Sequence, residues 1–222
     1  MAGEIQVNSV TALTESGSNI VLNNVDTATN RTNLGLGSIA TQAADSVSIS
    51  GGNITGGTIG SSVVFPTHHI IQIDSSQTQA AQTITSLTDI TGLSASMTIT
   101  SGNKVFISAS VLYGGSYDNY GYINVCDGSN SVIYQSNWAT GSQVNASMPT
   151  PVLGGSTRGP YHVHHVGFQY LWTPGVTSIT VKLRAERNYG SGSLYINRPE
   201  NNTNAAYIVG GTSSLTIMEV QA

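Results

Sequence analysis

The sequence contains few charged residues and very few basic ones. Asp, Glu, Lys and Arg make up 8 % of the 222 residues, whereas a soluble domain usually contains about a quarter. Lys and Arg together number 7 and the net charge is −4, so no basic stripe is available for nucleic acid or anionic lipid. Long Ala/Glu/Lys/Leu runs are lacking and Gly numbers 25. This composition argues against helical bundles, coiled coils and most α/β enzymes.

Cysteine and long apolar runs are also lacking. The single Cys126 excludes a disulfide framework or a thiolate metal cluster within one chain. No apolar run approaches the ~20 residues of a membrane-spanning helix. Residues 1–5 show neither a basic nor an apolar leader region, so we expect no signal peptide and synthesis in a reducing compartment. With 39 % hydrophobic residues and 10 Tyr, the chain is expected to fold rather than stay disordered.

No recognisable catalytic motif is present. The sequence lacks Gly-x-Ser-x-Gly, His-Glu-x-x-His and Gly-x-x-x-x-Gly-Lys-Ser, which mark nucleophile, zinc and phosphate sites. Asp118 and Asp127 are candidates for a carboxylate pair of the kind used in glycoside hydrolysis. Both lie near predicted turns, so we interpret them as solvated loop residues. We predict that the chain is not an enzyme and uses no cofactor.

The first 65 residues predict a small hairpin followed by a narrow neck. Aliphatic residues in 5–7 and 20–22 flank a turn, which is typical of two paired strands. In 41–65, Gly-Gly-x-Ile occurs twice, and Ile49, Ile54 and Ile59 recur at five-residue spacing. One chain offers these Ile side chains nothing to pack against, whereas three chains around one axis would bury them. We favour such a trimeric neck; the alternative is a flexible Gly/Ser/Thr linker.

From residue 66 onward the sequence predicts an all-β head. Short β-rich runs alternate with turn residues and no helical period appears, which is typical of a jelly-roll sandwich over 66–222. Asp127-Gly128 predicts a hairpin turn between two of these runs. The expected strands are 104–112, 120–125, 131–134, 162–170, 178–183, 193–196 and 214–220.

Aromatic residues in predicted loops are the candidate binding residues. Residues 113–120 hold three Tyr, an Asp and an Asn beside Gly residues. Tyrosine offers a rigid amphipathic surface and Asp or Asn a directed hydrogen bond, which suits contact with carbohydrate or protein. The alternative is that some rings cover the sandwich ends or a seam between subunits. The candidate receptor-binding residues are Tyr113, Tyr117, Asp118, Asn119, Tyr120, Trp138 and Tyr189.

Histidine is the other candidate for site chemistry. His162 and His164 would share one face of a predicted strand, with His165 on the other face. Two imidazoles are few for a metal, but three chains around an axis would supply six, enough for an octahedral site. We favour a structural role for these residues, and for His68 and His69, and predict no metal.

Several segments resemble bacteriophage virion proteins. Residues 32–41, Thr-Asn-Leu-Gly-Leu-Gly-Ser-Ile-Ala-Thr, resemble a segment common in bacteriophage tail-fibre and related virion fibre proteins. Residues 3–10 look like the virion-proximal start of similar proteins from marine phages, including cyanophages. The head resembles the TNF/C1q-like jelly rolls at phage fibre tips through residues 88–94, 127–129, 170–175, 195–198 and 213–220.

This resemblance implies a homotrimer on the virion, assembled in the host cytoplasm. Residues 1–40 would attach to other virion proteins, and the head would bind a host surface glycan or protein, without nucleic acid or membrane insertion. Because no collagen-like Gly-x-y tract is present, we expect a short fibre or spike, on the tail or the capsid. The main alternative is a trimeric capsid-decorating (cement) protein of the same fold. A capsule depolymerase and a non-viral C1q-like adhesin are further alternatives.

Overall fold

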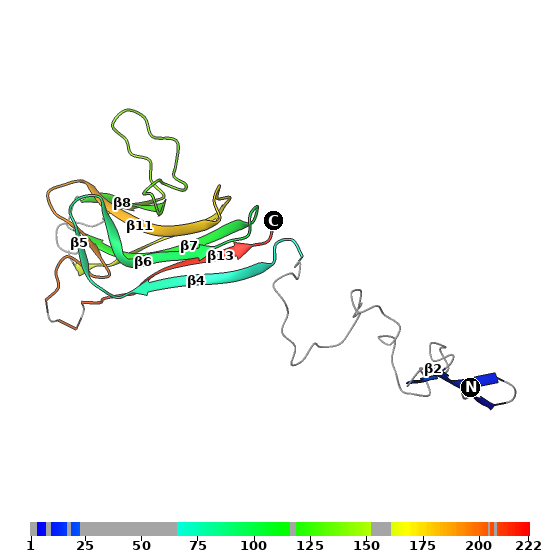
Figure 1. Cartoon of the computed structure of the whole chain (residues 1–222). Coiled ribbons are helices and arrows are strands. Elements are labelled where there is room, and N and C mark those ends of the chain that lie inside the picture. The colour runs from blue at the N-terminus through cyan, green and yellow to red at the C-terminus, as the bar shows by residue number, and fades with distance from the viewer. Residues whose placement is uncertain are drawn as a thin grey trace. The chain divides into compact units, whose positions relative to one another are not determined.

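The computed structural model describes residues 4–7, 10–16, 19–22, 66–115, 119–151, 161–203, 205–206 and 208–222. The chain divides into two units, 1–61 and 62–222. In the first, β1 (Glu4–Val7), β2 (Val10–Ser16) and β3 (Asn19–Leu22) form an antiparallel sheet in that order (Figure 1). A third strand is thus added to the predicted hairpin. The predicted neck, with Ile49, Ile54 and Ile59, and the predicted boundary after residue 40 lie outside the described residues.

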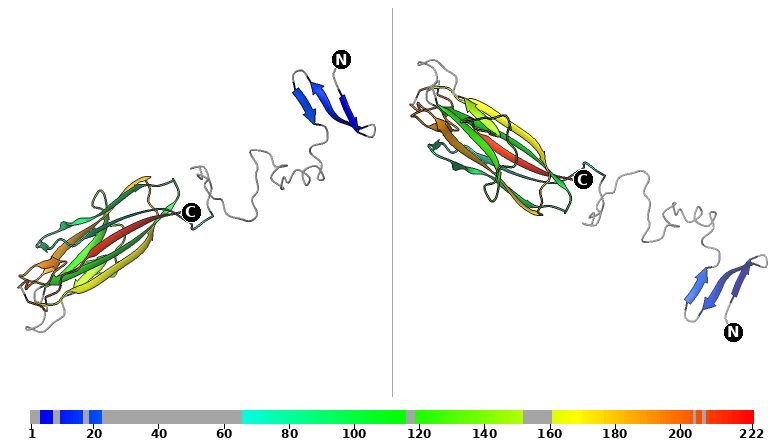
Figure 2. Two further views of the ribbon diagram at one scale, coloured as in Figure 1. Left: turned by 90° about the horizontal axis from the view of Figure 1, so that it is seen from below. Right: turned by 90° about the horizontal axis from the view of Figure 1, so that it is seen from above.

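The second unit, here called the head, is the predicted all-β sandwich of two antiparallel sheets (Figure 2). Most successive strands lie in opposite sheets, as in a jelly roll. The first sheet runs β4–β13–β7–β12–β5, with β10 on the other side of β7. Its strands are β4 (Ile70–Thr78), β5 (Gln82–Ile84), β7 (Lys104–Gly115), β10 (His164–Trp172), β12 (Leu194–Ile196) and β13 (Ser213–Val220). The second sheet runs β6 (Thr88–Thr98), β11 (Ser178–Tyr189), β8 (Tyr120–Asp127) and β9 (Met148–Pro151).

Strict alternation in three long strands builds the core. In β7, β11 and β13, every second side chain is buried between the sheets and the others face outward. The sequence predicted these strands as β-rich runs between turn signals, and strands are found at all three places; β11 extends beyond the predicted end at 183 to Tyr189. The buried residues of these strands include Val105, Ile107, Val111, Val181, Leu183, Leu215 and Ile217.

Strand β7 runs past the predicted end at residue 112 because two glycines continue it. Gly114 and Gly115 pair with Tyr195 and Leu194 of β12. A Cβ at Gly114 would lie 2.5 Å from the carbonyl oxygen of Arg198, so only glycine fits this close backbone approach. The glycines interpreted as part of a loop are therefore strand residues.

The predicted turn at 127–128 is confirmed, but the strand predicted at 131–134 is wrong. Oδ1 of Asp127 accepts hydrogen bonds of 2.9 Å from the backbone N–H groups of Ser129 and Ser131. Beyond this turn only one bridge forms, between Cys126 and Val132. The segment then continues as a long loop, residues 128–147, whose tip stands away from the two sheets (Figure 1).

The chain enters and leaves the head at the same end. The N–H of His68 donates to the carbonyl of Gln221 at 2.8 Å, and the N–H of Gln221 donates to the carbonyl of His69 at 2.9 Å. Strand β4 runs from this end, where Ile70 pairs with Val220, to the opposite end, where Thr78 pairs with Ser213. We call that opposite end the distal end. It carries the β7–β8, β11–β12 and β12–β13 connections.

A buried carboxylate secures the C-terminal strand. Glu219 is 1 % exposed and accepts hydrogen bonds from Gln72 Nε2 (2.6 Å), Asn103 Nδ2 (2.6 Å) and the Thr100 N–H (2.8 Å). Burial alone would raise the pKa of Glu219, but these hydrogen bonds to the charged form together lower it below its usual value. A depressed pKa stabilises the fold above the pKa of unfolded Glu, and this contribution is lost as the pH falls through the folded pKa.

We therefore expect Glu219→Gln to destabilise the head by about 1–3 kcal/mol at pH 7, because charge-assisted hydrogen bonds are replaced by weaker ones. The difference should be smaller at pH 3 than at pH 7, because the stabilisation that comes from a depressed pKa is lost as the pH falls. Urea unfolding of both proteins at the two pH values measures this. An equal gap at pH 7 and pH 3 would contradict the assignment.

Within the described ranges, the structure contains no helix long and apolar enough to cross a membrane.

Candidate functional site

Two of the predicted receptor-binding tyrosines form a pair at the distal end. Tyr120 begins β8, and Tyr189 ends β11 directly opposite it in the antiparallel register. Their ring centroids lie 6.0 Å apart at 58°, and the residues are 46 % and 67 % exposed. The pair therefore offers an amphipathic aromatic surface at the end of the head away from its chain entry.

Asn119, the residue before Tyr120, is buried and joins two backbone segments at the distal end. It is 2 % exposed; its Nδ2 donates to the Ser193 carbonyl at 3.3 Å, and its Oδ1 accepts from the Gly192 N–H at 3.2 Å. These bonds fasten the connection after β11 to the start of β8. Asn119 is thus a positioning residue, and it offers no exposed amide for the predicted receptor contact.

Tyr113 also differs from its predicted place in a binding loop. The residue is 4 % exposed and its ring lies 5.5 Å from that of His164, at 31°. Burial raises the pKa of the Tyr113 hydroxyl. Because β7 continues through Gly114, Tyr113 faces the core and presents no surface to a receptor. Tyr117 and Asp118 of the same candidate set lie outside the described residues.

Trp138 lies apart from the tyrosine pair. It belongs to the 128–147 loop, which leaves β8 at Asp127, at the other end of that strand from Tyr120. The indole is 67 % exposed. Oδ1 of Asn145 accepts hydrogen bonds from the Ala139 N–H (3.0 Å) and the Ser136 hydroxyl (3.2 Å), which brace the loop around it.

The histidines divide between the two faces of β10. His162 precedes the strand and is exposed, whereas His164 faces the sandwich interior opposite Tyr113. Its Nε2 is buried without a hydrogen-bond partner, and burial, with a smaller effect of nearby His162, lowers the pKa of His164. Burial therefore disfavours the charged imidazole, and the structural role expected of these histidines stays a prediction. Among the described residues, no three His, Cys, Asp or Glu side chains cluster closely enough to hold a metal.

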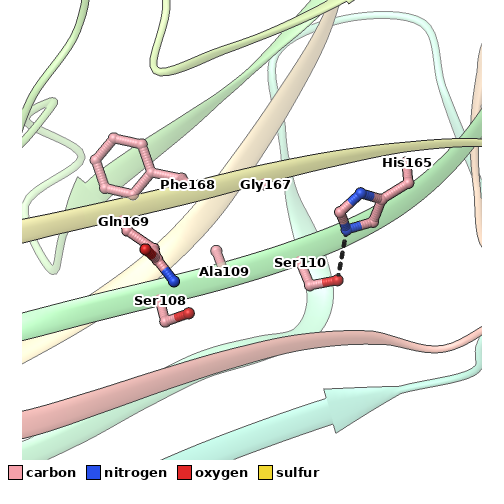
Figure 3. Close-up of a pocket in the computed structure, with 7 residues that line it drawn as sticks. All are labelled: Ser108, Ala109, Ser110, His165, Gly167, Phe168 and Gln169. Atoms are coloured by element: carbon pink, nitrogen blue, oxygen red, sulfur yellow. Dashed lines mark hydrogen bonds between the residues drawn. The ribbon is translucent and has the colours of Figure 1, made fainter.

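His165 instead lies on the outer face of the first sheet, where it lines a shallow pocket of about 470 Å³ between β7 and β10 (Figure 3). Its Nε2 and the Ser110 hydroxyl are 2.9 Å apart. Gly167 has no side chain, so it leaves the pocket open at its position. Ser108 and Gln169 complete the polar lining. The lining holds no carboxylate to orient the imidazole, as a Ser–His–Asp site would require. The pair lies 55 residues apart in sequence, so no local motif indicated it.

A row of four apolar side chains crosses the same outer face. In the strand register Ile73 of β4 lies beside Met218 of β13, Met218 beside Phe106 of β7, and Phe106 beside Leu171 of β10. Ile73 is 59 % and Leu171 42 % exposed. We call these four residues the apolar row. Contiguous apolar surface of this kind is typical of an interaction site.

The lone cysteine does not contribute to any of these surfaces. Cys126 is 1 % exposed, and burial raises the pKa of its thiol to about 11, so little reactive thiolate forms near neutral pH. We expect the native protein to resist iodoacetamide and to be labelled only when unfolded in urea, as mass spectrometry would measure. Rapid labelling without denaturant would contradict this placement.

Comparison with solved structures finds several similar chains. No family model matches the sequence, and no curated protein matches it. A chain from the "Structure of infectious bursal disease virus Gx strain" matches over 76 % of this chain and 43 % of that chain, with 13 % identity and a TM-score of 0.26. The match thus spans less than half of the viral chain, and a likeness at this TM-score carries no argument about function.

Proposed function

We propose that the protein is a homotrimeric virion fibre or spike protein whose head binds a receptor on the host surface. The observation that carries this proposal is the exposed Tyr120–Tyr189 pair at the distal end. A chain attached to the particle through residues 1–40 and entering the head at residue 66 would leave this end available to a host. The phage-like segments at 3–10 and 32–41 supply the virion context.

The apolar row supports the trimeric part of the proposal. Four apolar side chains on a solvent-facing sheet would be covered if copies of the head packed against this face. The predicted neck would place Ile49, Ile54 and Ile59 around the same threefold axis. Since a trimeric cement protein would use the same interface, the apolar row does not separate it from a fibre.

Adsorption of particles to host cells separates these two functions. Particles carrying Tyr120→Ala and Tyr189→Ala together should adsorb at least about tenfold more slowly, because small losses per head multiply in multivalent attachment. Val209→Ala is the matched control, since Val209 is 60 % exposed on the β12–β13 connection and lacks an aromatic ring. It should leave adsorption unchanged.

The contrary outcome is normal adsorption of the double variant. If those particles also lose resistance to heat or osmotic shock, the cement function replaces the receptor function. For both outcomes, light scattering on the purified variant is the control: a mass of three times 23.1 kDa means that the trimer is intact.

A further inference from the structure

A second aromatic surface lies where the 128–147 loop approaches strands β9 and β10. Tyr134, Trp138 and Val144 of the loop face Gly167 and Gln169 of β10 across a cavity of about 560 Å³. Tyr134, Trp138 and Val144 are 52 %, 67 % and 40 % exposed. Three large side chains with apolar surface thus line one open cavity, and none of them belongs to the buried core.

The cavity is held open before any ligand arrives. The Tyr134 ring stacks on Tyr170 of β10, with centroids 4.4 Å apart and planes at 19°. The loop closes on itself through the Ser136 N–H to the Ala146 carbonyl at 3.1 Å, and the Ser147 N–H donates to Oδ1 of Asn124 at 3.1 Å. A site ordered in advance loses less conformational entropy on binding.

The lining selects an uncharged ligand with both polar and apolar surface. The ten lining residues include no Asp, Glu, Lys, Arg or His, so no ion pair would compensate the desolvation of a charged group. Within the described part of the chain, the Trp138 indole N–H, the Tyr134 hydroxyl and the Gln169 amide make no hydrogen bond with another protein group. They can therefore bond to a ligand beside the aromatic faces.

We propose that this cavity binds a neutral pyranose residue of a surface glycan; it is a second site, separate from the Tyr120–Tyr189 pair, and its part in attachment rests on the proposed receptor function. A pyranose carries a face of C–H groups that can lie on the Trp138 indole, and hydroxyls around its rim that reach Gln169 and Tyr134. An apolar peptide side chain would leave these polar groups unmatched. A single shallow site of this kind would bind a sugar with a dissociation constant on the order of 1 mM. Several sites on a trimer and on a particle would raise the overall affinity.

The test uses the full chain and three neutral probes: methyl β-D-galactopyranoside, methyl α-D-mannopyranoside and methyl β-D-glucopyranoside. At least one of them, at about 10 mM, should show saturation-transfer NMR signals. Trp138→Ala should reduce that signal at least about tenfold, whereas Trp138→Phe should retain part of it because a ring face remains. Val176→Ala is the control, since Val176 is 63 % exposed in the β10–β11 connection and outside the cavity.

Three results would overturn the proposal: no neutral glycoside gives a signal, Trp138→Ala leaves the signal intact, or only an acidic sugar such as N-acetylneuraminic acid binds. A fall of the Trp138→Ala protein to monomer mass in light scattering would also overturn it, because the cavity would then be a seam between copies. If particle adsorption still depends on Tyr120 and Tyr189, the receptor function stands although the sugar site fails. If a glycoside binds but adsorption responds to neither aromatic surface, the receptor function fails and the sugar site stands.

Discussion

Ile73→Asp is expected to convert the proposed trimer into monomers. Ile73 is 59 % exposed in the isolated head and points away from the core, so the substitution should leave the fold of each head intact. In a trimer packed through the apolar row, it would place a carboxylate against Phe106, Met218 or Leu171 of a neighbouring copy. A buried charge without a partner costs about 3–5 kcal/mol, and a closed trimer contains three of them. Light scattering should change from three times 23.1 kDa to 23.1 kDa.

The matched control is Ile73→Leu, which keeps an apolar side chain of equal size at the same place in the row. It should remain trimeric at the same micromolar concentration. Retention of the trimer by Ile73→Asp, with an unchanged dissociation constant, would show that the subunits do not pack through the apolar row.

Leu183→Ala is expected to have the largest effect on stability. Leu183 is fully buried in the centre of β11, between strands β6 and β8 in the second sheet. Removing three carbons from such a site costs the transfer free energy plus a cavity term, together about 2–5 kcal/mol. Urea unfolding, monitored at one fixed protein concentration because a trimer's stability depends on it, should show a clearly lower midpoint.

Leu87→Ala controls for the chemistry of the substitution. Leu87 is 40 % exposed in the connection between β5 and β6, and its truncation should cost less than about 1 kcal/mol. Equal midpoints for Leu183→Ala and Leu87→Ala would contradict the assignment of Leu183 to the core.

Alternation helped to predict the long core strands but did not decide every case. Strand β8 was predicted although several successive residues are buried, and β4 was missed although its exposure alternates. In β7 and β13 each buried aliphatic residue is followed by an outward residue, and both were found from the sequence. Strand β6 escaped prediction because its alternation breaks at Gly92, whose φ of +81° lets Ile90 and Leu93 both reach the core. Strand β9 contains two prolines in four residues, which is tolerated only because it is an edge strand.

The exposure of part of the candidate site could also be predicted from the sequence. Exposed rings at Tyr120, Trp138 and Tyr189 follow from aromatic residues near turns. Tyr113 was assigned to the surface because Gly114 resembles a loop residue, whereas it actually marks a close backbone contact. The apolar row could not be predicted, since its four members come from four strands and become neighbours only through the register. The Ser110–His165 pair depends on the register in the same way.

Imaging the protein on the intact particle tests the central claim most directly. An antibody or gold label against this chain, viewed by electron cryo-microscopy, should mark a small number of short threefold spikes on the tail or capsid. Their outer ends should carry Tyr120 and Tyr189, and a label coupled to a cysteine introduced at Tyr189 should lie farther from the particle than one at Val176. Label spread in hundreds of copies over the capsid shell, with the Tyr189 end facing inward, or no label on any particle, would contradict the receptor-binding spike.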